Sequence, residues 1–435
     1  MIVPKKEFAE RRKLLLKNMG KNTIGIVFSA PERLRNIAVP YPYRQNSDFY
    51  YLTGFNEPEA VAVFIPDRKE GEFVLFNRER DLLMETWNGR RSGQAGACKD
   101  YGANQAFSIS KVNQIMPTLL GNKRALYLGM ERDFEFDQRI MRWLEASHKI
   151  REGINIPREF INIGRILHEM RLHKSKAEVA TIRKAISISK EAYLNVMRVC
   201  RPGMFEYELE AELLYRFIKN GGRYTSFETI IGCGSNSCVL HYVDNKERLT
   251  DGELVLIDSG VEYECYSSDV TRTLPVNGCF NPEQRAIYQA VLDAQTAVIK
   301  SIRPGIKWNQ LEFIAERMIT KKLLELKILR GNLKELLAKK SFRKFYMHHI
   351  GHWLGLDNKD PGLYKLDDWR VLKPGMVFTV EPGIYINASD AVDKKWWNIG
   401  VRIEDNVLVT KSGCEVLTRD IPKTIEDVER CMRRS

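Results

Sequence analysis

Residues 254–273 constrain the fold of this chain more than any other segment, because they place two aspartates beside apolar runs. Asp258 ends the apolar run 254–257, which is typical of a buried strand. Asp269 follows it, in front of a second strand-like stretch. A buried carboxylate without a partner is unfavourable by several kcal/mol, so it is normally hydrogen-bonded or bound to a cation. Asp258 taken alone fits a structural turn as well as it fits a metal ligand.

Three later segments carry further candidate ligands. His352 lies in MHHIGHWLGLD, Glu381 closes an apolar run in MVFTVEPGIYI, and Glu404 lies between strand-like residues in VRIEDNVLV. Together with the two aspartates they form an oxygen-rich donor set with one nitrogen. Such a set suits manganese, magnesium or cobalt better than structural zinc, which prefers cysteine and histidine. Four carboxylates around one ion would leave excess negative charge, so we expect a pair of cations.

The alternation of strand residues adds two supporting side chains. Residues two apart in a strand share a face, so Asp269 and Thr271 can point the same way, as can Arg402 and Glu404. The hydroxyl of Thr271 and the guanidinium of Arg402 are then placed to orient carboxylates from behind. A surface salt bridge is the alternative for Arg402.

The histidines do not form a familiar zinc-protease helix. His348 and His352 are four apart, but no glutamate follows the first of them, so the HExxH motif is absent. Gly351 and Gly355 also argue against a helix here. His241 ends another apolar run, in CVLHYVDN, and a hydrogen-bonded core histidine explains it as well as a functional one does.

Composition limits the kind of protein this is. The chain has 435 residues, of which 44% are hydrophobic and 29% charged, which suits a globular protein of two domains. The net charge of +12 raises the question of nucleic acid, but no nucleic-acid motif is present, so we expect a basic solvated surface and no nucleic-acid partner. We find neither a signal peptide nor an apolar run of membrane-spanning length, and the cysteines are scattered. These features predict a cytoplasmic protein without a membrane partner.

The order of elements predicts two domains, residues 1–172 and 173–435. In the first, strands alternate with helices, which indicates an α/β fold. Ser175 and Glu178 then form a plausible capping box at the start of a long helix. The elements expected in the first domain are helices at 6–18, 80–87, 111–120 and 134–147 and strands at 23–28, 60–65, 73–76 and 124–129.

The second domain contains a short internal repeat. Arg-Pro-Gly occurs at 201–203 and again at 303–305, and Leu-Glu follows at the same distance in both places, at 209–210 and 311–312. A long helix precedes each turn and an amphipathic helix follows it. The repeat predicts two related α+β halves that collect the candidate ligands between them.

These motifs resemble a known family. HYVDN, LVLIDSG, SSDVTRTLPVNG, MHHIGHWLGLD, TVEPGIYI and GVRIEDNVLVT, in this order, closely resemble the aminopeptidase P (Xaa-Pro aminopeptidase) branch of the pita-bread metallopeptidases. RQNSDFYYLTGFNEPEAV and FNRERDLLMETWNGRR resemble the N-terminal domain of that family, so the likeness covers nearly the whole chain. The resemblance implies an α/β creatinase-like N-terminal domain followed by an α+β pita-bread catalytic domain with two manganese ions.

The resemblance also implies roles for single residues. Asp269 and Glu404 would bridge the two metals, and Glu381 would act as general base as well as ligand. His241 and His348 would contact the substrate, and Tyr385 and Trp87 would border the proline pocket, with ordinary packing as the alternative for both aromatics. The complete set of implied metal ligands is Asp258, Asp269, His352, Glu381 and Glu404.

One position departs from the family pattern. After HWLGLD the family usually has Val-His-Asp, whereas this chain has Asn358, Lys359 and Asp360. A lysine holds a fixed positive charge and cannot relay protons near neutral pH as an imidazole does. We therefore expect the metals to bind and the turnover to be weakened or altered.

Three functions remain open at this stage. The leading one is a manganese aminopeptidase, with other divalent cations as substitutes, that removes the N-terminal residue from peptides with proline second. A prolidase-like dipeptidase on the same fold is the close rival. A metal-binding relative without catalysis is the third, and Lys359 is the feature that supports it. Because family members form dimers or tetramers, we expect a homo-oligomer, in which Trp87 would border a neighbouring site.

Overall fold

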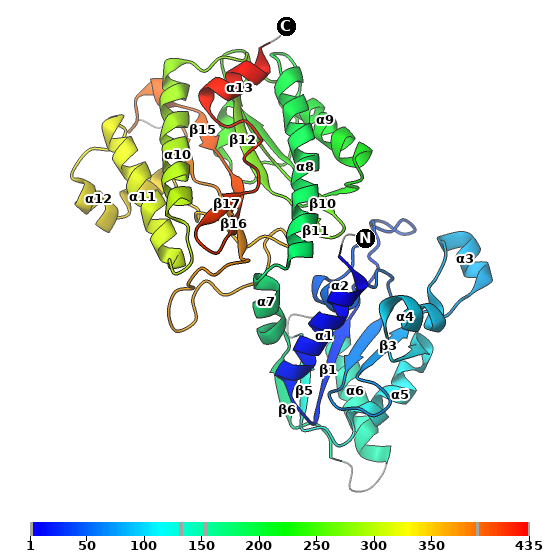
Figure 1. Ribbon diagram of the computed structural model, residues 1–435. Helices are drawn as coiled ribbons and strands as arrows, with labels where there is room; N and C mark the ends of the chain where they lie inside the picture. The colour runs from blue at the N-terminus through cyan, green and yellow to red at the C-terminus, as the bar shows by residue number, and fades with distance from the viewer. Residues whose placement is uncertain (1–2, 130–133, 151–154, 389–390, 434–435) are drawn as a thin grey trace. The chain divides into compact units, whose positions relative to one another are not determined.

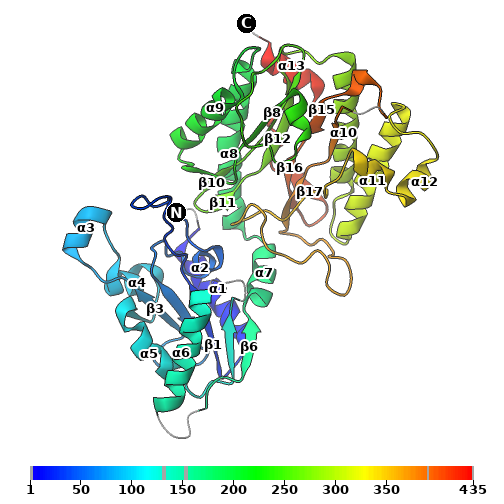
Figure 2. The same ribbon diagram turned by 180° about the vertical axis from the view of Figure 1, so that it is seen from behind.

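The computed structural model describes residues 3–129, 134–150, 155–388 and 391–433 (Figures 1 and 2). The chain divides into two compact units, one from Val3 to Met170 and one from Arg171 onward. The sequence predicts the boundary between residues 172 and 173. No helix in the described part of the chain is long and apolar enough to cross a membrane. The cytoplasmic location stays a prediction.

The first unit is built on a six-stranded mixed sheet with the order β4-β3-β2-β1-β5-β6. Its central strand β1 is antiparallel to β2 and parallel to β5, and every residue of β1 is buried. The strands are β1 Thr23–Phe28, β2 Val61–Phe64, β3 Phe73–Asn77, β4 Gln105–Ser108, β5 Ala125–Leu128 and β6 Glu159–Asn162. The helices are α1 Lys5–Met19, α2 Ser47–Thr53, α3 Leu82–Asn88, α4 Gly93–Tyr101, α5 Val112–Leu120 and α6 Phe134–Ile150, and α7 Gly164–Leu172 leads to the second unit.

All eight elements predicted for the first domain are present, with small differences at their ends. The sequence interpretation missed the two outermost strands, β4 and β6. Both are only partly buried, and the residues of β6 are exposed or half-buried, so neither carries an apolar run. It also missed α2, α4 and α7. Asn46 caps the start of α2, and its side chain accepts a hydrogen bond from the Phe49 backbone N–H at 3.0 Å.

The second unit places helices around short antiparallel sheets. Three strands, β8, β9 and β12, form one sheet with β9 in the middle, and β13, β16 and β17 form another. The helices are α8 Lys176–Val199, α9 Glu206–Lys219, α10 Pro282–Ser301, α11 Trp308–Glu325, α12 Leu333–Ala338 and α13 Ile425–Met432. The strands are β7 Tyr224–Thr225, β8 Ile230–Cys233, β9 Leu254–Ser259, β10 Val261–Tyr263, β11 Tyr266–Ser267, β12 Val270–Pro275, β13 Val377–Val380, β14 Gly383–Ile386, β15 Ile399–Arg402, β16 Asp405–Val409 and β17 Cys414–Val416.

The predicted repeat is confirmed by matching backbone contacts. Gly203 and Gly305 both have a positive φ, 88° and 93°, which glycine adopts without strain. The N–H of Gly203 donates to the carbonyl of Leu249 at 2.8 Å, and that of Gly305 donates to Leu372 at 3.0 Å. Each turn joins a long helix to a second helix, α8 to α9 and α10 to α11. The two halves are therefore built on the same local plan.

The predicted capping box at the start of α8 is also confirmed. The Ser175 hydroxyl accepts from the Glu178 N–H at 3.2 Å, and the Glu178 carboxylate accepts from the Ser175 N–H at 2.9 Å. The second oxygen of Glu178 accepts from the Tyr266 hydroxyl at 3.0 Å. The cap thus also ties α8 to β11.

A buried ion-pair network joins the start of the second unit to the loop after His352. The Asp360 carboxylate accepts from Arg171 at 2.6 Å and from Lys174 at 2.9 Å. All three side chains are at most 3% exposed. Burial alone would raise the pKa of Asp360, but the two cations outweigh burial and lower it below its ordinary value.

We expect Asp360→Asn to lower the free energy of unfolding by about 3–5 kcal/mol, because two buried cations lose the buried carboxylate that they share. Urea unfolding at neutral pH measures this. Asp357→Asn is the matched control, since the Asp357 carboxylate also binds Arg171, at 2.7 Å, but is 41% exposed. The control should cost less than about 1 kcal/mol.

The stabilisation that the Asp360 carboxylate provides through its ion pairs depends on pH in a defined way. It is complete above the ordinary carboxyl pKa of about 3.9 and is lost as the pH falls through the lower pKa of the folded state. The stability difference between the wild type and Asp360→Asn should therefore shrink in that acidic range. A difference that does not change with pH would contradict the assignment.

Candidate metal centre

A cavity of about 980 Å³ lies in the second unit. Most of the residues predicted for the site line it. These are His241, Asp258, Asp269, His348, His352, Lys359, Glu381, Arg402 and Glu404. Thr271 and Tyr385 are fully buried and contact these residues without lining the cavity. Trp87 lies on α3 of the first unit and is 79% exposed.

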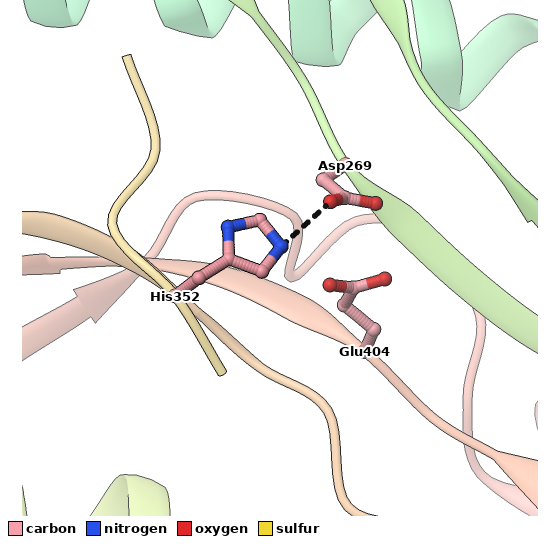
Figure 3. Close-up of side chains that lie close together, drawn as sticks. All are labelled: Asp269, His352 and Glu404. Carbon is pink, nitrogen blue, oxygen red and sulfur yellow. Dashed lines mark ion pairs between the residues drawn. The ribbon is translucent and has the colours of Figure 1, made fainter. Parts of the chain in front are cut away.

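Three side chains form the centre of the cavity. Asp269 immediately precedes β12, Glu404 lies between β15 and β16, and His352 lies in the segment before β13. Their donor atoms all lie within 4.8 Å of one another, and Figure 3 shows the three side chains pointing toward a common point. His352 Nε2 is 3.3 Å from Asp269 Oδ2. This arrangement can hold a metal ion.

The other two predicted ligands lie beside this centre. Glu381 directly follows β13, and its Oε1 is 3.6 Å from His352 Nε2 and accepts from the Thr379 hydroxyl at 3.1 Å. Asp258 lies on β9 opposite Thr271 of β12. Pairing of β9 with β12 therefore brings the two aspartates of residues 254–273 to the same cavity.

The free oxygens of this cluster fit a divalent metal site. Asp258 Oδ1 and Asp269 Oδ1 are buried and have no hydrogen-bond partner among the described residues. Burial raises the pKa of Asp269 well above its ordinary value, and the charges of Asp258 and Glu381 raise it further. Burial and the negative charges of Asp269 and Glu381 raise the pKa of Glu404 well above its ordinary value. Bound cations would relieve this repulsion, and oxygen-rich sets of this kind suit hard or borderline divalent ions.

The orientation of His352 leaves one ring nitrogen for a metal. Nδ1 lies 3.0 Å from the Trp353 carbonyl, which can only accept, so Nδ1 carries the proton. Nε2 then has a free lone pair directed toward Asp269. The backbone of His352 is held on both sides by Thr379, whose N–H donates to the His352 carbonyl at 2.9 Å and whose hydroxyl accepts from the His352 N–H at 3.0 Å. Such outer contacts keep a metal-binding imidazole in place.

Thr271 and Arg402 form hydrogen bonds to two of the candidate ligands. The Thr271 hydroxyl donates to Glu404 Oε2 at 2.8 Å and accepts from Arg402 Nε at 3.3 Å. Arg402 also donates to Asp258 Oδ2 at 2.6 Å and to the Tyr385 hydroxyl at 2.9 Å. Because Arg402 is only 3% exposed, the alternative of a surface salt bridge is wrong.

The histidines lie on the cavity wall. His241 is exposed to the cavity, so the alternative of a hydrogen-bonded core histidine is wrong. His348 donates from Nδ1 to the carbonyl of His349 at 2.8 Å and accepts at Nε2 from Tyr385 at 2.9 Å. Burial lowers the pKa of His348 to about 4, so the ring is neutral at physiological pH. Residues 347–376 contain no helix, as Gly351 and Gly355 predict.

Sequence interpretation gave no role to Arg272, which holds the strands of the centre together. Its side chain is fully buried and donates to the Glu404 carbonyl at 2.5 Å and to Asp405 Oδ1 at 2.9 Å. Burial alone would raise the pKa of Asp405, but Arg272 and Lys423 lower it. A charged residue inside the strand-like sequence VTRT is the signal that could have identified it.

Several cavity residues also lie outside the predicted set. They include aromatic, aliphatic, polar and charged side chains, and most of them show no catalytic spacing in the sequence. The aromatic ones are Phe227, Trp308, Tyr364 and Trp369, and the charged ones include Glu228 and Lys365.

Comparison with known proteins agrees with this geometry. The model for the aminopeptidase P N-terminal domain matches residues 8–127, and that for metallopeptidase family M24 matches residues 180–411. The Xaa-Pro aminopeptidase of Escherichia coli (strain K12) is 43% identical over 99% of this chain and 98% of its own length. The structure of Pseudomonas aeruginosa aminopeptidase PepP is 48% identical, covers 99% of both chains and has a TM-score of 0.98. Zinc-substituted E. coli aminopeptidase P in complex with product is 43% identical, covers 100% of both chains and has a TM-score of 0.96.

The chain is therefore an M24 metallopeptidase with an aminopeptidase P N-terminal domain. Within that class, the chain belongs to the Xaa-Pro aminopeptidase family, and it is a hydrolase. The predicted fold class, an α/β creatinase-like domain followed by an α+β pita-bread domain, is confirmed.

We expect Thr271→Val to weaken the binding of Mn²⁺ by about 10-fold, because Glu404 loses the hydroxyl that orients it. Titration calorimetry on metal-free protein measures the affinity. Thr273→Val is the matched control, since Thr273 is equally buried on the same strand but its hydroxyl bonds to the Arg402 backbone. Equal losses in the two variants would contradict a specific role for Thr271.

Proposed function

We propose that this hydrolase releases the N-terminal residue from peptides that have proline in second position, with two Mn²⁺ ions held by the five predicted ligands. The observation that carries the proposal is the convergence of Asp269, His352 and Glu404 within 4.8 Å, in a cavity that Asp258 and Glu381 also line. The proposal is further supported by the E. coli relative, which is a Xaa-Pro aminopeptidase and is 43% identical over nearly all of this chain. A structure of zinc-substituted E. coli aminopeptidase P supports the view that other divalent cations can take the same place.

Asp269 and Glu404, whose donor atoms lie at the centre of the cavity, would help to hold the cations. Asp258, His352 and Glu381 complete the set. When bound, two such cations lower the pKa of a water molecule and polarise the scissile carbonyl. The four carboxylates would be ionised in that state, because the cations outweigh their mutual repulsion.

Glu381 is the proposed general base. The Thr379 hydroxyl donates to Glu381 Oε1, and the backbone N–H of Glu381 donates to the Ile350 carbonyl at 2.8 Å. These two bonds fix the Glu381 carboxylate at the edge of the centre. Glu381 would take a proton from the attacking water at a carboxylate oxygen and pass it to the departing proline nitrogen. Proton transfer of this kind contributes roughly 10²–10⁴-fold to a rate.

His241 and His348 are the proposed substrate contacts on the cavity wall. His348 is oriented by Tyr385, and the Tyr385 hydroxyl in turn accepts from Arg402. A donor from this wall would stabilise the oxyanion of the tetrahedral intermediate. Because the scissile nitrogen of a proline peptide carries no N–H, the ring must be recognised by its shape. The aromatic lining residues Trp308, Tyr364 and Trp369 could supply that surface.

The decisive experiment compares two matched peptides. Metal-free protein reloaded with Mn²⁺ is incubated with Arg-Pro-Pro and with Arg-Ala-Ala, and the products are identified by mass spectrometry. We expect manganese-dependent loss of only the first residue, and only from the proline peptide. Glu381→Gln should lower kcat by at least about 10²-fold.

The same assay separates the alternatives. Hydrolysis of Arg-Pro dipeptide without cleavage of the tripeptide would favour a prolidase-like enzyme. Silence on all peptides, with two metals bound per chain, would favour a binding protein without catalysis. Equal cleavage of both tripeptides would contradict the proposed role of proline.

Lys359 is proposed to weaken or alter turnover. Its side chain lines the cavity and is exposed, and it places a fixed positive charge where the family usually has histidine. We expect Lys359→His to raise kcat/KM for the proline peptide, because an imidazole can exchange a proton near neutral pH. Lys365→His changes another lysine of the cavity and should give no such gain. If kcat/KM does not increase in the Lys359→His variant, the hypothesis is wrong.

We also propose that the protein is a homo-oligomer, a dimer or a tetramer. Helix α3 supports this, since none of its residues is buried and Leu82, Leu83 and Trp87 are 70–79% exposed. Exposed apolar side chains this close together favour a protein contact. A monomer at all concentrations in sedimentation would contradict the proposal and would remove the predicted role of Trp87 at a neighbouring site.

A further inference from the structure

A glutamate of α11 forms hydrogen bonds to the segment that carries His348. Glu312 Oε2 accepts from the Ile350 backbone N–H at 3.2 Å, and Glu312 Oε1 accepts from His349 Nδ1 at 3.1 Å. The Glu312 side chain is only 15% exposed, whereas that of His349 is 80% exposed. A carboxylate in this position is well placed to act on the backbone of the segment.

One peptide group connects Glu312 to His348. The N–H of Ile350, which donates to Glu312, and the carbonyl of His349 belong to the same peptide group. That carbonyl accepts from His348 Nδ1 at 2.8 Å. A negative charge at the N–H end of a peptide group strengthens its carbonyl as an acceptor, because hydrogen bonds in a chain polarise one another. The charge of Glu312 therefore favours a proton on His348 Nδ1.

The opposite side of the His348 ring completes the chain. With its proton on Nδ1, the neutral ring can only accept at Nε2, and it lies 2.9 Å from the Tyr385 hydroxyl. The Tyr385 oxygen accepts from Arg402 at 2.9 Å and so has its own proton free to donate to His348. The four side chains thus have one consistent set of donors and acceptors.

The other half of the repeat contains a related contact. Glu210 occupies in α9 the position that Glu312 occupies in α11, within the repeated Leu-Glu pair. It accepts from the Asn245 amide at 3.0 Å, and Asn245 accepts from the Ile231 N–H at 2.9 Å. Asn245 closes the loop that carries His241 on the cavity wall. Both halves therefore use this glutamate to hold a segment with a cavity histidine.

We propose that Glu312 is a positioning residue, which fixes the tautomer and orientation of His348 through the peptide group between residues 349 and 350. The relevance of this to turnover rests on the substrate contact proposed above for His348. The effect on the imidazole itself is independent of that function and can be observed directly.

The test is the tautomer of His348, read by ¹⁵N NMR of histidine-labelled protein. The chain has 7 histidines, and His348→Asn assigns the signal. Spectra are recorded on metal-free protein and on protein loaded with Zn²⁺, which is diamagnetic. We expect the proton on Nδ1 in the wild type and a shift toward the Nε2-protonated form in Glu312→Gln. We also expect kcat to fall by about 10-fold with KM little changed, as for other residues that orient an active-site histidine.

Glu316→Gln is the matched control. Glu316 lies one helical turn further along α11, burial raises its pKa as it raises that of Glu312, and within the described residues its carboxylate makes no hydrogen bond to the His348 segment. This variant should leave the tautomer and kcat unchanged. A loss of kcat equal to that of Glu312→Gln would indicate a general effect on the helix and would overturn the proposal.

A second variant distinguishes Glu312 from Tyr385 as the cause. Tyr385→Phe removes the hydroxyl at Nε2 and leaves the contact through the peptide group intact. The proposal predicts that His348 keeps its Nδ1 proton in this variant. A tautomer that changes in Tyr385→Phe and stays unchanged in Glu312→Gln would overturn it. If the tautomer shifts in Glu312→Gln while kcat does not, positioning by Glu312 stands and the proposed substrate contact of His348 fails.

Discussion

Repulsion among four carboxylates in one buried cavity is the constraint on which the second unit depends. Asp258, Asp269, Glu381 and Glu404 all line the same cavity, and in the part of the chain that the structure describes two of their oxygens have no hydrogen-bond partner. Burying such a cluster is unfavourable unless cations compensate it. Arg402 supplies part of that compensation directly, through its bond to Asp258. The rest of the charge is the reason why the site suits divalent metal ions.

The surrounding structure keeps these carboxylates in place with groups of opposite charge and with hydroxyls. Arg272 donates to the backbone of Glu404 and to the side chain of Asp405. The hydroxyls of Thr271 and Thr379 donate to the carboxylates of Glu404 and Glu381. Most of these bonds join strands that are distant in the sequence. The geometry of the centre is therefore a property of how the strands pair, and single elements do not define it.

This explains which parts could be predicted from the sequence. Apolar runs that end in an acidic residue predicted Asp258 and Glu381, and strand-like residues on both sides predicted Glu404, because burial and strand alternation are local properties. The repeat and the capping box were also local signals. Arg272 binds a residue more than a hundred positions away in the sequence, and Glu312 binds one more than thirty positions away. No local pattern identifies such partners. The outermost strands of the first unit were missed because they bury too little to show a pattern.

The division of the ligands between the two halves of the repeat has a consequence for how the protein folds. Asp258 and Asp269 belong to the first half, and His352, Glu381 and Glu404 belong to the second. Neither half carries all five candidate ligands, so the complete site exists only after the halves have docked. Contacts of such large sequence separation form late and slowly. Repulsion among the carboxylates would oppose that docking until protons or cations compensate it, so the supply of metal would influence the last step of folding.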